Sequence, residues 1–180
     1  GLDGNHGIRF VFPHAPAIPV TINQGYVMPA WYDILEMSLE RKIDTAQIEQ
    51  SASSIRALIA QENERGVPSE HIVIAGFSQG GAVAYQTALS YDKPLAGLLT
   101  LSTYLATKDS LVLSDANKNL KIAIHHGTQD PVVPVQLGQE AKAWLESKGY
   151  QPQFYSYPMA HQVCMPQLKI IGKWLNDVLA

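Results

Sequence analysis

Residues 72–82 have the sequence Ile-Val-Ile-Ala-Gly-Phe-Ser-Gln-Gly-Gly-Ala, in which an apolar, β-branched run leads directly into the pattern Gly-x-Ser-x-Gly. This pattern is typical of a nucleophile elbow, a sharp turn between a strand and a helix that exposes one serine at its tip. Glycine is needed where the backbone passes close to itself in such a turn. The sequence therefore predicts a strand at 72–75, a reactive Ser78 and a helix behind it at 82–89. The alternative is an ordinary strand–turn–helix corner whose serine has no role.

The composition excludes several classes of protein. The chain has 180 residues, of which 46% are hydrophobic and 16% charged, with a net charge of −3. This length predicts one domain, residues 1–180. We find no basic cluster with interleaved aromatic residues that would bind nucleic acid, and no apolar run near the roughly 18 residues of a membrane span. The first residues lack the regions of a signal peptide, and the single cysteine excludes an internal disulfide framework. We expect a cytoplasmic protein, although the abrupt start leaves a removed targeting segment open.

Short apolar strands alternate with helical patterns, which predicts a mostly parallel central sheet flanked by crossover helices. A sequence typical of a capping box begins at Asp44, and Gly66 ends the helix behind it. Residues 13–31 contain four prolines and predict a long irregular loop, a kind of segment that is usually functional. In chain order we expect strands at 8–12, 72–75, 95–101, 121–125 and 153–157, and helices at 44–66, 82–89, 135–148 and from 166 onward.

Two partners are predicted for Ser78, because a serine hydroxyl is a weak nucleophile until a nearby base takes its proton. In folds with this elbow the order along the chain is serine, acid, histidine. Of the six histidines, only His161 follows both the serine and the plausible acids. Asp130 directly follows the strand that begins at 121, as the acid should. The plain alternatives are a surface histidine and a turn aspartate bonded to its own backbone.

Three other side chains invite a chemical interpretation. His125 and His126 are neighbours on a predicted strand and so point to opposite faces, which makes them a poor pair for one metal ion. We therefore predict a strand end and no metal site. Cys164 lacks an elbow of its own and stands at the start of a helix, so we expect it to be a small buried apolar residue.

With these residues in place, the sequence resembles the small carboxylesterase, lysophospholipase and acyl-protein thioesterase family. The resemblance lies in the segments 76–82, 126–134 and 159–161, and a fourth segment, 9–33, is similar to the region before the family's first long helix. It covers nearly the whole chain from Ile8 on, and the bacterial carboxylesterase branch is the most similar. The resemblance implies an α/β-hydrolase without a lid domain, no cofactor, and hydrolysis of esters or thioesters with short-to-medium apolar acyl groups.

The resemblance also implies roles for single residues. Ser78, Asp130 and His161 would form the catalytic triad, and the backbone N–H of Gln79 would give half of the oxyanion hole. Apolar residues of the 13–31 loop and of the strand ends are candidates for the wall of an acyl pocket. The four substrate-binding candidates are Trp31, Tyr104, Val132 and Met159.

The sequence departs from the family at its front. Family members usually begin with a strand that leads into a His-Gly-Leu-Gly loop, and a helix follows before the strand matched here by 8–12. This chain offers only the five residues 1–5 for that loop. We therefore expect the N-terminal strand and helix to be missing, and Leu2 to be the second oxyanion donor.

Several functions stay open. A carboxylesterase acting on a small-molecule ester or thioester is the first, and a lysophospholipase or a protein depalmitoylase acting on a lipid or an acylated protein is a variant of it. A damaged oxyanion loop would instead leave a binding protein that keeps the triad without turnover. Tyrosines and tryptophans near the open loops leave a homodimer open as well.

Overall fold

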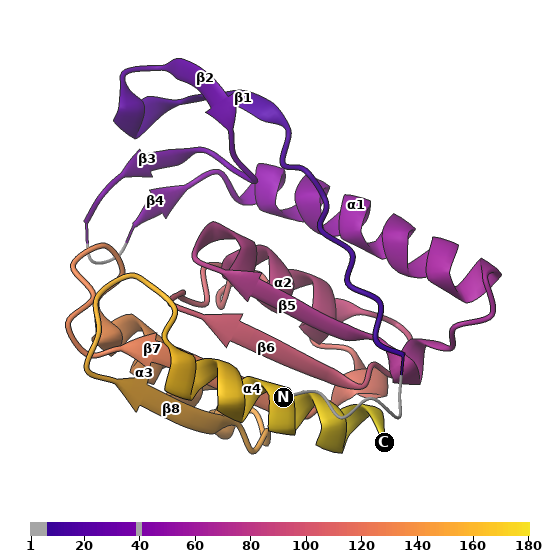
Figure 1. The fold of residues 1–180 in the computed structure, drawn as a ribbon. Coiled ribbons are helices and arrows are strands. Elements are labelled where there is room, and N and C mark those ends of the chain that lie inside the picture. The colour runs from indigo at the N-terminus through magenta and orange to yellow at the C-terminus, as the bar shows by residue number, and fades with distance from the viewer. Residues whose placement is uncertain (1–6, 39–40) are drawn as a thin grey trace.

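The computed structural model of the protein describes residues 7–38 and 41–180. Its centre is a parallel sheet in which Phe77 pairs with Leu101, Leu101 with His125, and His125 with Tyr155. The carboxyl ends of the strands therefore meet along one edge, on the left in Figure 1. The strands, in spatial order, are β5 (Val73–Phe77), β6 (Gly97–Leu101), β7 (Ile122–Gly127) and β8 (Gln153–Tyr157).

Helices cover both faces of this sheet (Figure 1). The helices are α1 (Thr45–Glu64), α2 (Gln79–Ser90), α3 (Val135–Ser147) and α4 (Met165–Leu179), with 3₁₀ turns at Thr21–Asn23, Ser69–His71 and Asp115–Asn117. Successive side chains of a strand point to opposite faces. Leu98 and Ile122 accordingly pack in a core with α2 and α3, to which α1 adds Ile59. Leu99 and Ala123 pack against α4 on the other face. None of the described helices is long and apolar enough to cross a bilayer.

Helix α1 begins where its sequence predicts. The Asp44 carboxylate accepts a hydrogen bond from the backbone N–H of Gln47 at 3.0 Å, which satisfies one of the free donors of the first turn. The Gln47 side chain accepts from the N–H of Asp33 at 2.6 Å, so it fixes the preceding segment. Gly66, at a φ of 91°, follows the end of the helix.

The strand predicted at 8–12 is wrong. Residues 7–16 form neither strand nor helix. The rings of Phe10 and Phe12 stack on each other, and the two residues keep 54% and 82% of their surface exposed. Aromatic and β-branched residues favour strands because they fit a half-buried sheet surface. This segment is rich in strand-forming residues but does not pair with another strand. It is attached to α1 by an ion pair between Arg9 and Glu62.

The irregular loop predicted at 13–31 contains a hairpin instead. Strand β1 (Ala17–Val20) pairs antiparallel with β2 (Tyr26–Pro29). Gln24 and Gly25 have φ angles of 57° and 74° in the turn between them. A two-stranded ribbon leaves each strand a free edge, where proline is tolerated. A second pair, β3 (Ile34–Glu36) and β4 (Lys42–Ile43), leads into α1, and both pairs lie above the central sheet in Figure 1.

Candidate active site

Ser78 stands alone between the end of β5 and the start of α2. Its backbone has a φ of 53° and a ψ of −120°, a conformation that costs energy for any residue with a Cβ. Its N–H donates to the carbonyl of Leu101 at 2.9 Å, and its carbonyl accepts from the Thr103 hydroxyl at 2.5 Å. The neighbouring strand thus holds the strained turn, which is the nucleophile elbow predicted from the sequence.

The glycines of the elbow are required by close backbone contacts. A Cβ at Gly76 would lie 2.1 Å from the carbonyl oxygen of Gly80, so the strand end and the first helical turn could not approach each other. A Cβ at Gly81 would lie 2.3 Å from the side chain of Thr103. The pattern Gly-x-Ser-x-Gly-Gly therefore reflects packing as well as turn geometry.

Three side chains from three strand ends meet at this edge of the sheet. Nε2 of His161 lies 3.1 Å from Oγ of Ser78, and Nδ1 of His161 lies 2.7 Å from Oδ2 of Asp130. Because an ionised carboxylate only accepts hydrogen bonds, we assign the proton to Nδ1. Nε2 is then free to accept the hydroxyl proton, which is the arrangement of a general base on a serine.

The Asp130 carboxylate is held by its own turn. Its Oδ1 accepts from the backbone N–H groups of Val132 and Val133, both at 2.8 Å, and its side chain is fully buried. A buried charge is tolerated when hydrogen bonds satisfy it. Asp130 therefore combines both interpretations: Oδ1 stabilises the turn, and Oδ2 pairs with His161.

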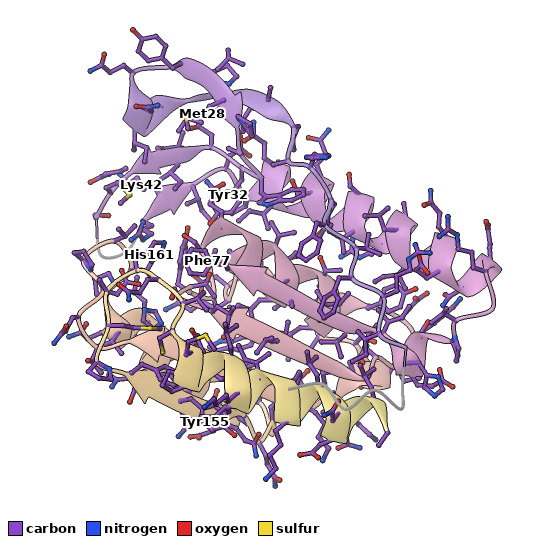
Figure 2. All side chains as sticks on the ribbon, in the orientation of Figure 1. Met28, Tyr32, Lys42, Phe77, Tyr155 and His161 are labelled. Carbon is purple, nitrogen blue, oxygen red and sulfur yellow. The ribbon has the colours of Figure 1, made fainter. Side chains whose placement is uncertain are left out.

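The loop that carries His161 follows β8 and lies against the Asp130 turn. The N–H of Gln129 donates to the carbonyl of Met159 at 3.0 Å. The imidazole packs beside the Phe77 ring, with ring centres 4.8 Å apart, and both lie at the end of β5 in Figure 2. The His161 side chain keeps 19% of its surface exposed, so the site is open to solvent and to a ligand.

Gly127 sets the distance between these two loops. A Cβ there would lie 2.3 Å from the carbonyl oxygen of Met159 and 2.4 Å from that of Ala160. We expect Gly127→Ala to push the His161 loop outward and to lower kcat about 100-fold, as a misplacement near 1 Å can. Hydrolysis of a p-nitrophenyl ester, with circular dichroism as a test of folding, measures this.

The control for that variant is Gly149→Ala. Gly149 has a φ of 91° and nothing within 4 Å of the added Cβ, so the change strains the backbone away from the site. It should lower stability and leave kcat within a few-fold. Equal kcat in Gly127→Ala and the natural protein would contradict the role of Gly127.

The other predicted site residues lie in different surroundings. Gln79 begins α2, so its N–H is one of the free donors of a helix N-terminus, and its side chain bonds the backbone of Trp31 at 3.2 Å and of Tyr32 at 3.0 Å. Trp31 is partly buried, with its indole nitrogen 3.8 Å from where a Cβ of Gly80 would be. Leu2 lies outside the described residues.

Of the other substrate-binding candidates, Val132 is exposed, whereas Tyr104 and Met159 are buried. The Tyr104 hydroxyl lies 2.6 Å from that of Tyr32, and burial raises the pKa of Tyr32 well above its ordinary value.

Sequence reasoning missed Arg41, which lies between β3 and β4 and belongs to no sequence motif. Its guanidinium lies 5.1 Å from the centre of the Tyr104 ring and donates to the carbonyl of Val132. It therefore connects the β3–β4 segment to the sheet edge that carries Ser78, Asp130 and His161.

Among residues 7–38 and 41–180, no three histidine, cysteine or acidic side chains are grouped so as to hold a metal ion. His125 and His126 both lie in β7 and have separate partners: the hydroxyl of Tyr157 at 2.9 Å and the carbonyl of Val133 at 2.7 Å. Cys164 differs from the expected buried apolar residue. It is half-buried at the N-cap of α4, where its backbone N–H donates to Oε1 of Gln167 at 3.3 Å.

Comparison with known proteins identifies the class. The chain belongs to the phospholipase/carboxylesterase family, whose model matches residues 4–179. It is 38% identical to acyl-protein thioesterase 1 of Neurospora crassa over 182 residues, which cover 96% of this chain and 74% of that protein. Among solved structures, SOBER1 of Arabidopsis thaliana superposes with a TM-score of 0.89 at 33% identity, covering 94% of this chain and 83% of that one.

Acyl-protein thioesterase 2 of Zea mays superposes with a TM-score of 0.83 at 25% identity, covering 93% of this chain and 80% of that one. The predicted family and the predicted α/β-hydrolase fold are therefore confirmed. The protein is a member of a hydrolase family that acts on esters and thioesters.

Proposed function

We propose that the protein hydrolyses carboxylic esters or thioesters with short-to-medium apolar acyl groups through an acyl-enzyme on Ser78. The observation that carries the proposal is the continuous hydrogen-bond path from the Ser78 hydroxyl through His161 to the buried Asp130 carboxylate. A serine, a base within hydrogen-bond reach and a third group that orients the base are the signature of nucleophilic catalysis.

The reaction proceeds in two steps. Ser78 attacks the acyl carbonyl while Nε2 of His161 takes its proton, and the alcohol or thiol leaves after His161 returns that proton to it. Water then attacks the acyl-enzyme with His161 again as the base. The carboxylate of Asp130 stabilises the imidazolium in both steps. The N–H of Gln79, at the positive end of α2, stabilises the oxyanion, and we propose Leu2 as the second donor.

The acyl group is proposed to bind beside the elbow, against the indole of Trp31 and the exposed side chain of Val132. Tyr104 and Met159 support this wall from beneath, since both are buried. The names of the relatives from Neurospora crassa and Zea mays support including the thioesters of acylated proteins among the substrates. A lysophospholipid presents the same kind of ester and is the second substrate class to test.

A substrate series tests the proposal. We expect hydrolysis of p-nitrophenyl esters from acetyl to dodecanoyl, and of an acyl thioester, together with labelling of Ser78 by a fluorophosphonate probe. Labelling without hydrolysis of any ester would favour the alternative of an impaired, binding protein. Absence of both labelling and hydrolysis in the folded protein would overturn the proposal.

A further inference from the structure

His126 is a buried imidazole directly behind Asp130. It lies in β7 with no exposed surface, and Nε2 lies 2.7 Å from the carbonyl oxygen of Val133. A carbonyl can only accept, so Nε2 carries a hydrogen. Nδ1 has no hydrogen-bond partner among residues 7–38 and 41–180 and packs against α3, where a Cβ at Gly138 would lie 2.5 Å from it. The ring is therefore fixed in one tautomer and one orientation.

His126 and Asp130 both bond the backbone of one residue, Val133. The carbonyl of Val133 accepts from His126, and the N–H of the same residue donates to Oδ1 of Asp130 at 2.8 Å. Oδ2, which pairs with His161, lies 3.8 Å from Nε2 of His126. A short chain of contacts thus runs from the interior of the sheet to the imidazole beside Ser78.

The charge of His126 matters because of these neighbours. Burial lowers the pKa of His126, so its ring is neutral at neutral pH. The titratable groups that face it are Asp130 and, beyond that carboxylate, His161, while α3 presents Gly138 to the ring. A neutral ring leaves the full charge of the carboxylate to His161.

We propose that His126 is a positioning residue for the hydrolysis proposed above: its Nε2–H fixes the backbone of Val133 through the carbonyl, and the N–H of the same residue aims the Asp130 carboxylate at Nδ1 of His161. The inference rests on the proposed function, because it assigns His126 an action through Asp130 on the base of that reaction. The proposed role requires no contact between His126 and the substrate.

Substitutions that keep or remove the Nε2–H donor test this. The amide of His126→Gln reaches the position of Nε2 and should keep kcat within a few-fold. His126→Phe keeps the ring volume and removes the donor, and should lower kcat about 10- to 100-fold with an unchanged KM. Because a loosened Asp130 stabilises the imidazolium less, the acid limb of the pH profile should move to lower pH.

His125→Phe is the matched control. His125 is the next residue of β7, equally buried, but its ring stacks on Tyr155 at 4.7 Å, on the face that α4 covers. Figure 2 shows Tyr155 well away from His161. This variant should lower the melting temperature without moving the pH profile. Equal kcat losses in the two phenylalanine variants, or an unmoved profile in His126→Phe, would overturn the proposal.

Two further measurements separate this proposal from the proposed function. The Nδ1 proton of His161 gives a low-field NMR signal, which should weaken or shift upfield in His126→Phe whether or not the protein turns over an ester. If the natural protein hydrolyses nothing, the proposed function fails and this signal alone decides the role of His126. If His126→Phe does not fold, His126→Asn, whose amide is too short to reach the Val133 carbonyl, should show the same losses while His126→Gln does not.

Discussion

Ser78→Ala is expected to lower kcat for ester hydrolysis about a million-fold, leaving only the residual rate that binding and oxyanion stabilisation support. The alanine leaves His161 and Asp130 in place but removes the oxygen that the proposed acyl-enzyme requires. Stability should stay the same, since serine and alanine both carry a Cβ at the φ of 53° that the elbow imposes. Burst and steady-state release of p-nitrophenol measure the effect.

Ser102→Ala is the matched control for this variant. Ser102 also directly follows a strand of the sheet, with a positive φ of 50°, and its buried hydroxyl has no hydrogen-bond partner within the described part of the chain. Removing that hydroxyl should leave kcat within a few-fold. Turnover by Ser78→Ala above a thousandth of the natural rate would contradict the assignment of Ser78 as the nucleophile.

Asp130→Asn is expected to lower kcat about 10⁴-fold through the tautomer of His161. Two backbone N–H groups point at Oδ1, so the amide oxygen of asparagine must take that position. The amide nitrogen then faces Nδ1 of His161, and two donors cannot bond each other. The imidazole must carry its hydrogen on Nε2 instead, where it can no longer accept the proton of Ser78.

Asp33→Asn is the matched control, because it also replaces a hydrogen-bonded carboxylate by an amide but at a residue that does not contact His161. The Asp33 carboxylate accepts from the backbone N–H of Thr21 at 2.8 Å and from its hydroxyl at 2.5 Å, in the segment that precedes β3. Asp33→Asn should leave kcat within a few-fold. If Asp130→Asn kept more than a tenth of the natural kcat, the carboxylate would not be the group that orients His161.

The sequence sufficed to predict that Ser78, Asp130 and His161 lie together, because each of them follows a strand of one parallel sheet. Ser78, Asp130 and His161 lie just beyond β5, β7 and β8, and the carboxyl ends of parallel strands meet at one edge. Hydrophobic runs mark such strands clearly, since both faces are buried. Because the order along the chain is serine, acid, histidine, His161 was the one histidine that could be the base.

What surrounds the triad could not be predicted in the same way. The hairpin within 13–31 and the short pair β3–β4 carry too few residues for a periodic pattern, and prolines in β1 and β2 argued against strands. At 8–12 the error is the opposite: a strand was predicted where none forms. Strand-forming residues are favoured only when they pack in a sheet, and the described chain gives this run no partner strand. Arg41 reaches the site only through tertiary contacts, which leave no local signal.

The separation of the three residues along the chain carries a consequence for divergence. His161 is 83 residues from Ser78 in the chain and 3.1 Å away in space, and the strand ends with the short loops that follow them set the distance between the two residues. Whole turns can therefore be added to α2 or α3, or taken away, without disturbing the reacting atoms. In distant homologues the number of residues between serine, acid and base should drift freely, whereas the few residues that separate each of them from its own strand should not.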